Sequence, residues 1–369
     1  LLKIILEMIL LTRMTISPKR RKEIKHIVLL ALQRMPDLSL PLKIKALCKS
    51  YSNIRLIPFS THMERRNLTY KEMLEYCETS DSCVDYYVKE DKYIVYYNDI
   101  EKHNIIDSNR YRWNIAHELG HILLNHHKMN NKTRIFRSTL TNAEYDYLEN
   151  EADYFTQLVL VPHIVLYAFK IQNAVHIKNL CKISNPASRK RYYEYQIWKS
   201  NMQKDDPYDK PLFFLYHDFV YKKECLICGA HLIQKIGNYC PICGNKNSLQ
   251  WGDGKMIYLK LKTYDNGKLS ECPICKNEET DLDGGYCQIC GTYLINHCTN
   301  QNCQNAEPLP SNARYCPICG SPSIFYRDKI LKEWNYKEDD LPTNDGFMNI
   351  PDGINENLSF SDINEELPF

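Results

Sequence analysis

The chain has 369 residues, enough for two or three domains, and its 44% hydrophobic and 25% charged residues are typical of globular proteins. Its formal net charge is only +2, although residues 338–369 hold nine Asp or Glu and no Lys or Arg. The apolar stretch at residues 1–11 is too short to span a bilayer, contains Glu7 and is followed by no small-residue cleavage site. These features argue against a membrane or secreted protein. We expect a cytoplasmic one, with Met14 as a candidate start.

Helix and strand signals alternate through the first hundred residues. Residues 18–35 carry an apolar stripe at helical spacing, formed by Ile24, Ile27, Val28, Ala31 and Leu32. This stripe favours a packing helix over contact with DNA or membrane. A helix over 41–51 and a strand at 54–57 are expected next, and two runs of β-formers at 84–88 and 93–97 predict a hairpin. The pattern as a whole predicts an α+β fold.

Residues 117–121, His-Glu-Leu-Gly-His, carry the H-E-x-x-H signature. On a helix, His117 and His121 lie four residues apart and project from one face, where two neutral imidazoles can bind one Zn²⁺ at about 2.0–2.1 Å. Glu118 lies beside them and can act as general base toward water. A catalytic zinc site also needs a third protein ligand and an open fourth position.

Residues 144–162 predict a second helix, ended by Pro162, that supplies this third ligand. Glu149 and Asp153 are four residues apart, so both carboxylates lie on one face of the helix. We assign Glu149 as the third ligand. Asp153 then lies behind the ligands, and its carboxylate accepts the other N–H of a ligand histidine.

Glu151 and His127 are alternative candidates for the third ligand, and an oxyanion stabiliser has still to be found. Glu151 is the weaker candidate because it points to another face of the helix, and His127 would fit the pattern H-E-x-x-H-x-x-G-x-x-H. Leu124 stands where that pattern needs a glycine for its turn, which favours Glu149. The sequence does not identify an oxyanion stabiliser. The candidates are Tyr145, Tyr147, His126 and Arg112.

Beyond Pro162, residues 163–200 are expected to be helical. Within them, residues 177–192 are similar to a helix-turn-helix with a basic triplet at 189–191. A single basic triplet is weak electrostatic evidence, so we interpret this region as structural packing rather than a DNA-binding surface. The polar, proline-flanked stretch that follows indicates a linker over 201–223.

Twelve of the sixteen cysteines fall in short-spaced pairs after residue 224. They form three sets of four: Cys225, Cys228, Cys240 and Cys243; Cys272, Cys275, Cys287 and Cys290; Cys298, Cys303, Cys316 and Cys319. Each second pair follows a Tyr and precedes a Gly. Four thiolates from two such knuckles make a closed tetrahedral zinc site, and metal binding supplies folding energy. The spacing therefore predicts three structural zinc ribbons and not disulfides.

The ribbons leave their metal and their purpose open. Rubredoxin-like iron uses similar knuckles and is the alternative to zinc. Residues 222–334 hold thirteen Lys or Arg against eleven Asp or Glu, so a protein-docking or structural role is favoured over nucleic acid. The four other cysteines, Cys48, Cys77, Cys83 and Cys181, are interpreted as small buried or neutral thiols.

The C-terminal stretch is acidic and rich in Asn, Asp, Gly and Pro, which predicts disorder. Its end, Leu-Pro-Phe after two glutamates, looks like the C-terminal tip of bacterial single-stranded-DNA-binding proteins. We expect Phe369 and the preceding acids to recruit a partner with a basic-rimmed pocket or to occupy a pocket of this protein. A solubilising tail is the alternative.

The residues RYRWNIAHELGHILLNH at 110–126 and ENEADYFTQLVLVP at 149–162 resemble the ImmA/IrrE family of metallo-endopeptidases. Trp113, Asp153, Thr156 and Val161 depart mildly from the family pattern. The resemblance implies a zincin-like, gluzincin-type core with a small sheet, one catalytic zinc and a protein substrate. The chain would then divide into an N-terminal extension (1–35), a metallopeptidase domain with a helix-turn-helix-like C-terminal part (36–200), a linker (201–223), three zinc-ribbon modules (224–334) and an acidic tail (335–369).

The function expected from these features is zinc-dependent endoproteolysis. By the resemblance, the substrate is a helix-turn-helix repressor or antitoxin in a stress-response or mobile-element regulatory system. The alternative is a zinc-ribbon adaptor or DNA-binding regulator in which the peptidase fold is a non-catalytic scaffold. The presence of Glu118 beside two histidines favours the enzyme, because a scaffold has no physical need for it.

Overall fold

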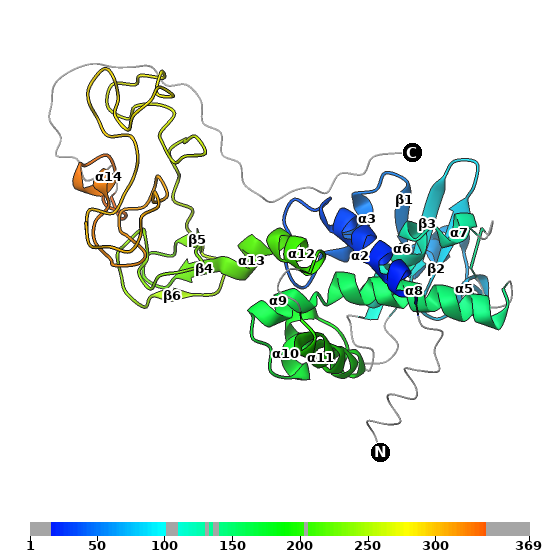
Figure 1. The fold of residues 1–369 in the computed structure, drawn as a ribbon. Helices are drawn as coiled ribbons and strands as arrows, with labels where there is room; N and C mark the ends of the chain where they lie inside the picture. Colours follow the sequence, from blue (N-terminus) through cyan, green and yellow to red (C-terminus); the bar gives the residue numbers. More distant parts are fainter. Residues whose placement is uncertain (1–15, 101–109, 130–132, 136–139, 203–205, 337–369) are drawn as a thin grey trace. The chain divides into compact units, whose positions relative to one another are not determined.

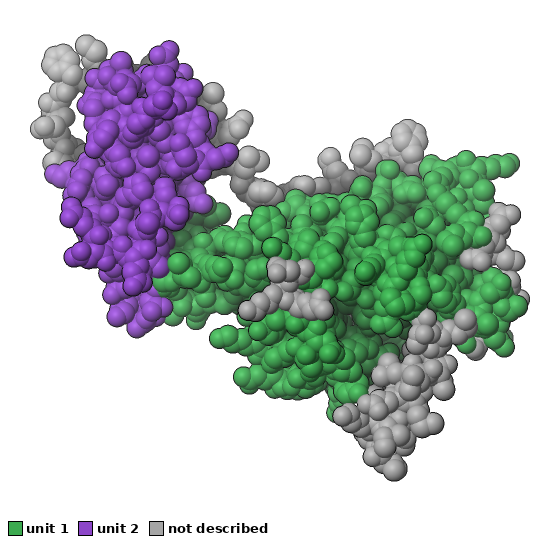
Figure 2. All heavy atoms as spheres, viewed as in Figure 1, with its two compact units in different colours: residues 1–237, 249–257 green, residues 238–248, 258–369 purple. Residues whose placement is uncertain are grey.

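The computed structural model describes residues 16–100, 110–129, 133–135, 140–202 and 206–336. The chain divides into two compact units, residues 1–237 with 249–257 and residues 238–248 with 258–369 (Figure 2). The apolar stretch 1–11 and nearly all of the acidic tail with its Leu-Pro-Phe end lie outside the described residues. Among the residues described, no helix has the length and apolar character needed to cross a bilayer.

A three-stranded sheet lies in the first unit (Figure 1). Its strands are β1 (Ile54–Pro58), β2 (Ser82–Tyr87) and β3 (Lys92–Tyr97), in the order β1-β3-β2. β2 and β3 form the predicted antiparallel hairpin, in which Val84 pairs with Val95, and β1 runs parallel to β3. β2 is thus an edge strand of this sheet, and on its outer edge the N–H of Tyr86 bonds the carbonyl of Thr133 at 2.9 Å.

Four helices accompany the sheet: α2 (Pro18–Leu32), α3 (Ile44–Lys49), α4 (Phe59–Arg66) and α5 (Tyr70–Cys77). α2 begins where Ser17 caps it and Pro18 occupies its first turn, and it buries the predicted stripe of Ile24, Val28 and Leu32. α2 packs against α8. The N-terminal helix is therefore part of the main core.

Two helices carry the predicted metal ligands and pack closely together: α6 (Arg110–Leu123) and α8 (Asn142–Leu160). α8 starts with a capping box between Thr141 and Glu144. The close approach depends on Gly120, because a Cβ there would lie 3.2 Å from Ala152 Cα and 3.1 Å from Phe155 Cδ1. The short α7 (His126–Met129) lies between them in sequence.

Five further helices follow in the first unit: α9 (His163–Ala168), α10 (Ala174–Cys181), α11 (Asn185–Ser200), α12 (Asp209–Leu215) and α13 (His217–Tyr221). The last two occupy the region expected to be a linker. Leu212, Tyr216 and Phe219 are buried in the main core. Residues 209–221 are thus folded, because their apolar side chains bury against the preceding helices.

The cysteine-rich part has little regular structure. It contains β4 (Lys222–Cys225), β5 (His231–Ile233), β6 (Leu249–Gln250) and α14 (Ile324–Arg327), with the sheet order β5-β4-β6. A mixed α+β architecture, as expected, results for the chain as a whole.

One interpretation of the remaining cysteines is wrong. Cys77 at the end of α5 and Cys83 on β2 form a disulfide, with Cα atoms 5.6 Å apart, within the usual range for such bonds. The two cysteines are six residues apart, on either side of the turn between α5 and β2, and this spacing was not interpreted as a disulfide. Cys48 and Cys181 are buried free thiols, as expected.

Candidate metal centre and active site

The helical spacing of His117 and His121 places both Nε2 atoms side by side on α6, 3.1 Å apart. Glu149 on α8 faces them, with Oε2 3.1 Å from His117 Nε2 and Oε1 3.3 Å from His121 Nε2. The structure thus brings together the three residues assigned as ligands, from two helices joined at Gly120. In the described part of the chain they form one of four clusters of metal-ligating side chains.

The triangle of donor atoms has the size that a metal ion requires. Atoms bound tetrahedrally to Zn²⁺ at about 2.0–2.1 Å lie about 3.3 Å from one another. The distance of 3.1 Å between the two Nε2 atoms, and the distances of 3.1 and 3.3 Å from them to Glu149 Oε2 and Oε1, match this spacing. Two imidazole nitrogens and one carboxylate, with a side open to a cleft, also fit the donor set of a catalytic rather than a structural site.

The electrostatics of the triangle favour a positive charge. Burial alone would raise the pKa of Glu149, but its hydrogen bonds to His117 and His121 hold that pKa well below its usual range. Burial opposes protonation of His117, yet hydrogen bonds to Asp153 and Glu149 raise its pKa to about 10. Burial lowers the pKa of His121 to about 4, so this imidazole is neutral, as a ligand must be. A metal cation at the triangle would replace the proton that His117 otherwise carries and would supply the positive charge that the carboxylates attract.

The second nitrogen of His117 contacts the carboxylate predicted for this role. Asp153 Oδ1 lies 3.2 Å from His117 Nδ1, one turn along α8 from Glu149. A carboxylate there accepts the Nδ1–H and leaves the Nε2 lone pair directed at the triangle.

Glu118 lies next to the triangle and is fixed by a residue that the sequence did not indicate. Ser82, the first residue of β2, donates its hydroxyl to Glu118 Oε1 at 2.8 Å. Burial raises the pKa of Glu118 above its ordinary value, although His117 and the Ser82 hydroxyl counteract the shift. A raised carboxylate pKa moves toward the range in which a general base works near neutral pH.

A cleft of about 380 Å³ opens over these groups. His117, Glu118, His121, Glu149 and Asp153 line it from the helices. Its other wall is formed by the end of α5 and the start of β2, including the Cys77–Cys83 disulfide, Ser82 and Val84. The cleft therefore has the ligand triangle and Glu118 on one side and the edge strand β2 on the other.

The other residues considered from sequence lie in different places. His127 lines the cleft but packs against the rings of Tyr93 and Tyr86, at centroid distances of 5.8 and 6.1 Å, and is outside the ligand cluster. Of the four oxyanion candidates, Tyr145 lines the cleft. Arg112 is buried in α6 away from the cleft lining, and Tyr147 bonds Glu151.

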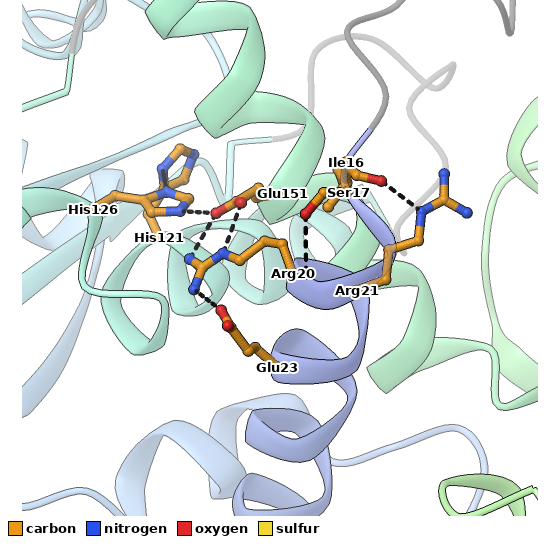
Figure 3. Close-up of polar contacts among 8 residues, drawn as sticks. All are labelled: Ile16, Ser17, Arg20, Arg21, Glu23, His121, His126 and Glu151. Carbon is orange, nitrogen blue, oxygen red and sulfur yellow. Dashed lines mark hydrogen bonds and ion pairs between the residues drawn. The ribbon is translucent and has the colours of Figure 1, made fainter.

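His126 and Glu151 form a layer behind the ligands. His126 Nδ1 lies 2.9 Å from His121 Nδ1, and its Nε2 lies 3.0 Å from Glu151 Oε2. Glu151 in turn accepts two bonds from Arg20 of α2, at 2.7 and 2.8 Å (Figure 3). Glu151 does point away from the triangle, as expected, but the sequence did not reveal its contact with His126 and Arg20.

The twelve C-terminal cysteines form three four-cysteine clusters, as predicted. In the second and third clusters, facing sulfur atoms lie 3.4–3.7 Å apart: Cys272–Cys290, Cys275–Cys287, Cys298–Cys319 and Cys303–Cys316. Four sulfurs around Zn²⁺ at about 2.3 Å have nearly this spacing. At most knuckles a glycine with positive φ lets the backbone turn back toward the cluster, for example Gly229 and Gly320.

Comparison with protein families agrees with this geometry. Residues 84–184 match the family model Peptidase_M78, described as the IrrE N-terminal-like domain. The match includes both helices of the triangle, and the chain therefore contains a metallopeptidase domain of this family with a His-His-Glu candidate metal site. Neither the curated proteins nor the solved structures give a significant match.

Proposed function

We propose that the chain is a zinc-dependent endopeptidase with a zincin-type core, which cleaves a helix-turn-helix repressor or antitoxin in a stress-response or mobile-element regulatory system. One observation carries the proposal. The donor atoms of His117, His121 and Glu149 form a metal-sized triangle, with the Glu118 carboxylate beside it in an open cleft.

The chain's own residues account for the proton transfers of peptide hydrolysis. Zinc, when bound, supplies a Lewis acid that polarises the scissile carbonyl and activates water. Glu118 takes the proton of the attacking water and later delivers it to the leaving amine. The Ser82 hydroxyl holds this carboxylate in one orientation through both transfers. Tyr145 is placed in the cleft lining, where its hydroxyl can be tested as the oxyanion donor.

The edge strand β2 favours an extended polypeptide as substrate. The N–H of Tyr86 already bonds the carbonyl of Thr133 on the side of β2 away from β3. Backbone groups alternate along a strand, so the N–H of Val84 faces the same side. Val84 also lines the cleft. We therefore propose that a linker segment of the substrate pairs with β2 near Val84 and so crosses the ligand triangle.

The contacts of the basic triplet at 189–191 count against DNA binding through residues 177–192. Arg191, the last of the three basic residues, is only 3% exposed and pairs with Glu194 at 2.9 Å. It is committed to packing between α11 and the core, and this reduces the basic surface on which DNA recognition would depend. The ribbons and the acidic Leu-Pro-Phe end are then proposed to recruit protein partners or substrate.

The test compares the wild-type chain with Glu118→Gln, each co-expressed with a helix-turn-helix repressor as the candidate substrate. Asp146→Asn, an acid-to-amide change at an exposed position of the same helical core, is the matched control. We expect a new repressor fragment with the wild type and the control. Glu118→Gln should keep four bound metal ions but cleave at least about a hundredfold more slowly. Cleavage at the wild-type rate by Glu118→Gln would exclude the proposed general base.

A further inference from the structure

Arg20 on α2 forms the outer end of a buried chain of side chains that reaches the ligand triangle (Figure 3). This series of side-chain contacts runs from Arg20 through Glu151 and His126 to His121, with successive distances of 2.7–2.8, 3.0 and 2.9 Å. His126 is fully buried, and Glu151 is 1% exposed. Arg20 lies 64 residues before the segment that matches the peptidase family.

If His121 binds a metal ion through Nε2, that bond determines the direction of each hydrogen bond in this series of side chains. A ligand Nε2 must carry a lone pair, so the proton of neutral His121 sits on Nδ1 and is donated to His126 Nδ1. His126 must then carry its own proton on Nε2 and donate it to Glu151. Only an acceptor can stand at that position, and an ionised carboxylate is an acceptor without a donor.

Arg20 fixes the carboxylate that ends this sequence of bonds. Its Nε bonds Glu151 Oε1 and its Nη2 bonds Oε2, a two-point contact that sets the plane of the carboxylate. Oε2 is also the atom that accepts from His126. Tyr147 bonds the same carboxylate, and Glu23 bonds the third guanidinium nitrogen of Arg20 at 3.1 Å.

We propose that Arg20 is a positioning residue for the metal ligand His121, acting through Glu151 and His126, and that helix α2 is therefore a working part of the metal centre. The proposal rests on the candidate metal site and does not require proteolysis. The competing explanation is that Arg20 and Glu151 merely attach α2 to α8.

Arg21 provides a matched control on the same helix. Its side chain points away from Glu151 and donates to the carbonyl of Ile16 at 3.2 Å (Figure 3). Arg20→Met and Arg21→Met thus remove the same group from neighbouring positions, but only the first removes a bond to the buried chain.

The experiment measures metal affinity in the full-length chain. The three cysteine clusters are first filled with Zn²⁺, and the fourth site is then titrated with Co²⁺ in competition with a chelator of known affinity. Cobalt absorption without thiolate bands reports the histidine–carboxylate site alone. We expect Arg20→Met to weaken metal binding at this site by about 10- to 100-fold, the range for loss of a residue that orients a metal ligand, and to change its visible spectrum. Arg21→Met should stay within about twofold of the wild type.

Two further variants separate positioning from simple attachment. Arg20→Lys keeps the charge but cannot form the two-point contact, so it should recover only part of the affinity. Glu151→Gln can present an N–H to His126 Nε2 and should weaken metal binding as strongly as Arg20→Met. If Arg20→Met fails to fold, these two variants carry the test.

Wild-type affinity and spectrum in Arg20→Met or Glu151→Gln would overturn the proposal, as would equal losses in Arg20→Met and Arg21→Met. A chain that binds the fourth metal in an Arg20-dependent way but cleaves no repressor would contradict the proposed function and leave this inference intact. If cleavage occurs and both cleavage and metal binding are unchanged in Arg20→Met, the proposed function stands and this inference is overturned.

Discussion

His163 shows how a single partly buried imidazole links the stability of the helical part to pH. It lies at the start of α9 against the rings of Tyr195 and Trp198, with centroid distances of 6.0 and 5.7 Å. Burial lowers its pKa to about 3, and the charges of Arg191 and Lys25 contribute in the same direction. The folded chain therefore holds His163 neutral, whereas in the unfolded chain it takes up a proton below about pH 6.5.

This difference predicts a measurable loss of stability in acid. Because the folded pKa is lowered, the contribution of His163 is complete above about pH 6.5 and falls as the pH drops toward 3. Between pH 7.5 and 5.5 the loss should be about 1.4 kcal/mol in the free energy of unfolding. His163→Gln should lose that much less over the same interval, measured by chemical denaturation of both proteins. His176→Gln, an exposed histidine, should lose as much as the wild type.

At the residue scale, sequence spacing was enough to place the ligand triangle. His117 and His121 are four apart on one helix, and helical geometry alone puts them on one face. Ser82 and Arg20 could not be found in this way. Each reaches the site from an element distant in sequence, and a lone serine or arginine in a chain carries no spacing that points to a partner.

Gly120 controls the distance between the two helices that carry the ligands. A Cβ at this position would lie 3.2 and 3.3 Å from backbone atoms of Ala152, which have no freedom to move aside. Alanine would favour the helix by about 1 kcal/mol over glycine. Overpacking in a well-filled interface costs about 1–3 kcal/mol, so the clash should prevail.

We therefore predict that Gly120→Ala lowers the free energy of unfolding by about 1 kcal/mol and weakens metal binding at the triangle, because α6 moves away from Glu149 on α8. Chemical denaturation and the fourth-site Co²⁺ titration measure the two effects. Metal loading of the three cysteine clusters is the internal control and should be unchanged. A Gly120→Ala chain with greater stability and wild-type affinity would show that the helix interface has room for the methyl group.

At the scale of elements, the longer periodic segments were predicted, whereas several short helices were not. The helix expected to carry His117 and His121, the helix over 144–162 and the hairpin with strands at 84–88 and 93–97 correspond to α6, α8 and β2–β3. α4 and α5 went unpredicted, and α12 and α13 fell in the expected linker. Each of these helices has eight residues or fewer, too short to be stable alone, so tertiary burial rather than local sequence decides their formation.

For the molecule as a whole, cysteine spacing was a more reliable guide than hydrophobic pattern. Four thiolates in two knuckles have a fixed geometry that follows from the sequence, and all three predicted clusters are present. The end of the helical part was harder to place. The polar residues around 201–206 obscure the fact that the next fifteen residues return to the main core.

The packing of residues 207–221 against the main core predicts where the chain can be truncated without loss of the fold. Tyr208, Leu212, Tyr216 and Phe219 are each at most 5% exposed and belong to the main core. Burial of one large apolar side chain contributes about 1.5–3 kcal/mol, so loss of all four approaches the whole stability of a typical domain, about 5–15 kcal/mol. We expect a chain ending at residue 222 to unfold cooperatively and to bind one metal ion at the triangle. A chain ending at residue 202 should be unfolded or aggregated at 25 °C. Chemical denaturation and metal analysis of the two purified chains make the comparison, and equal stability would show that α12 and α13 contribute nothing to the core.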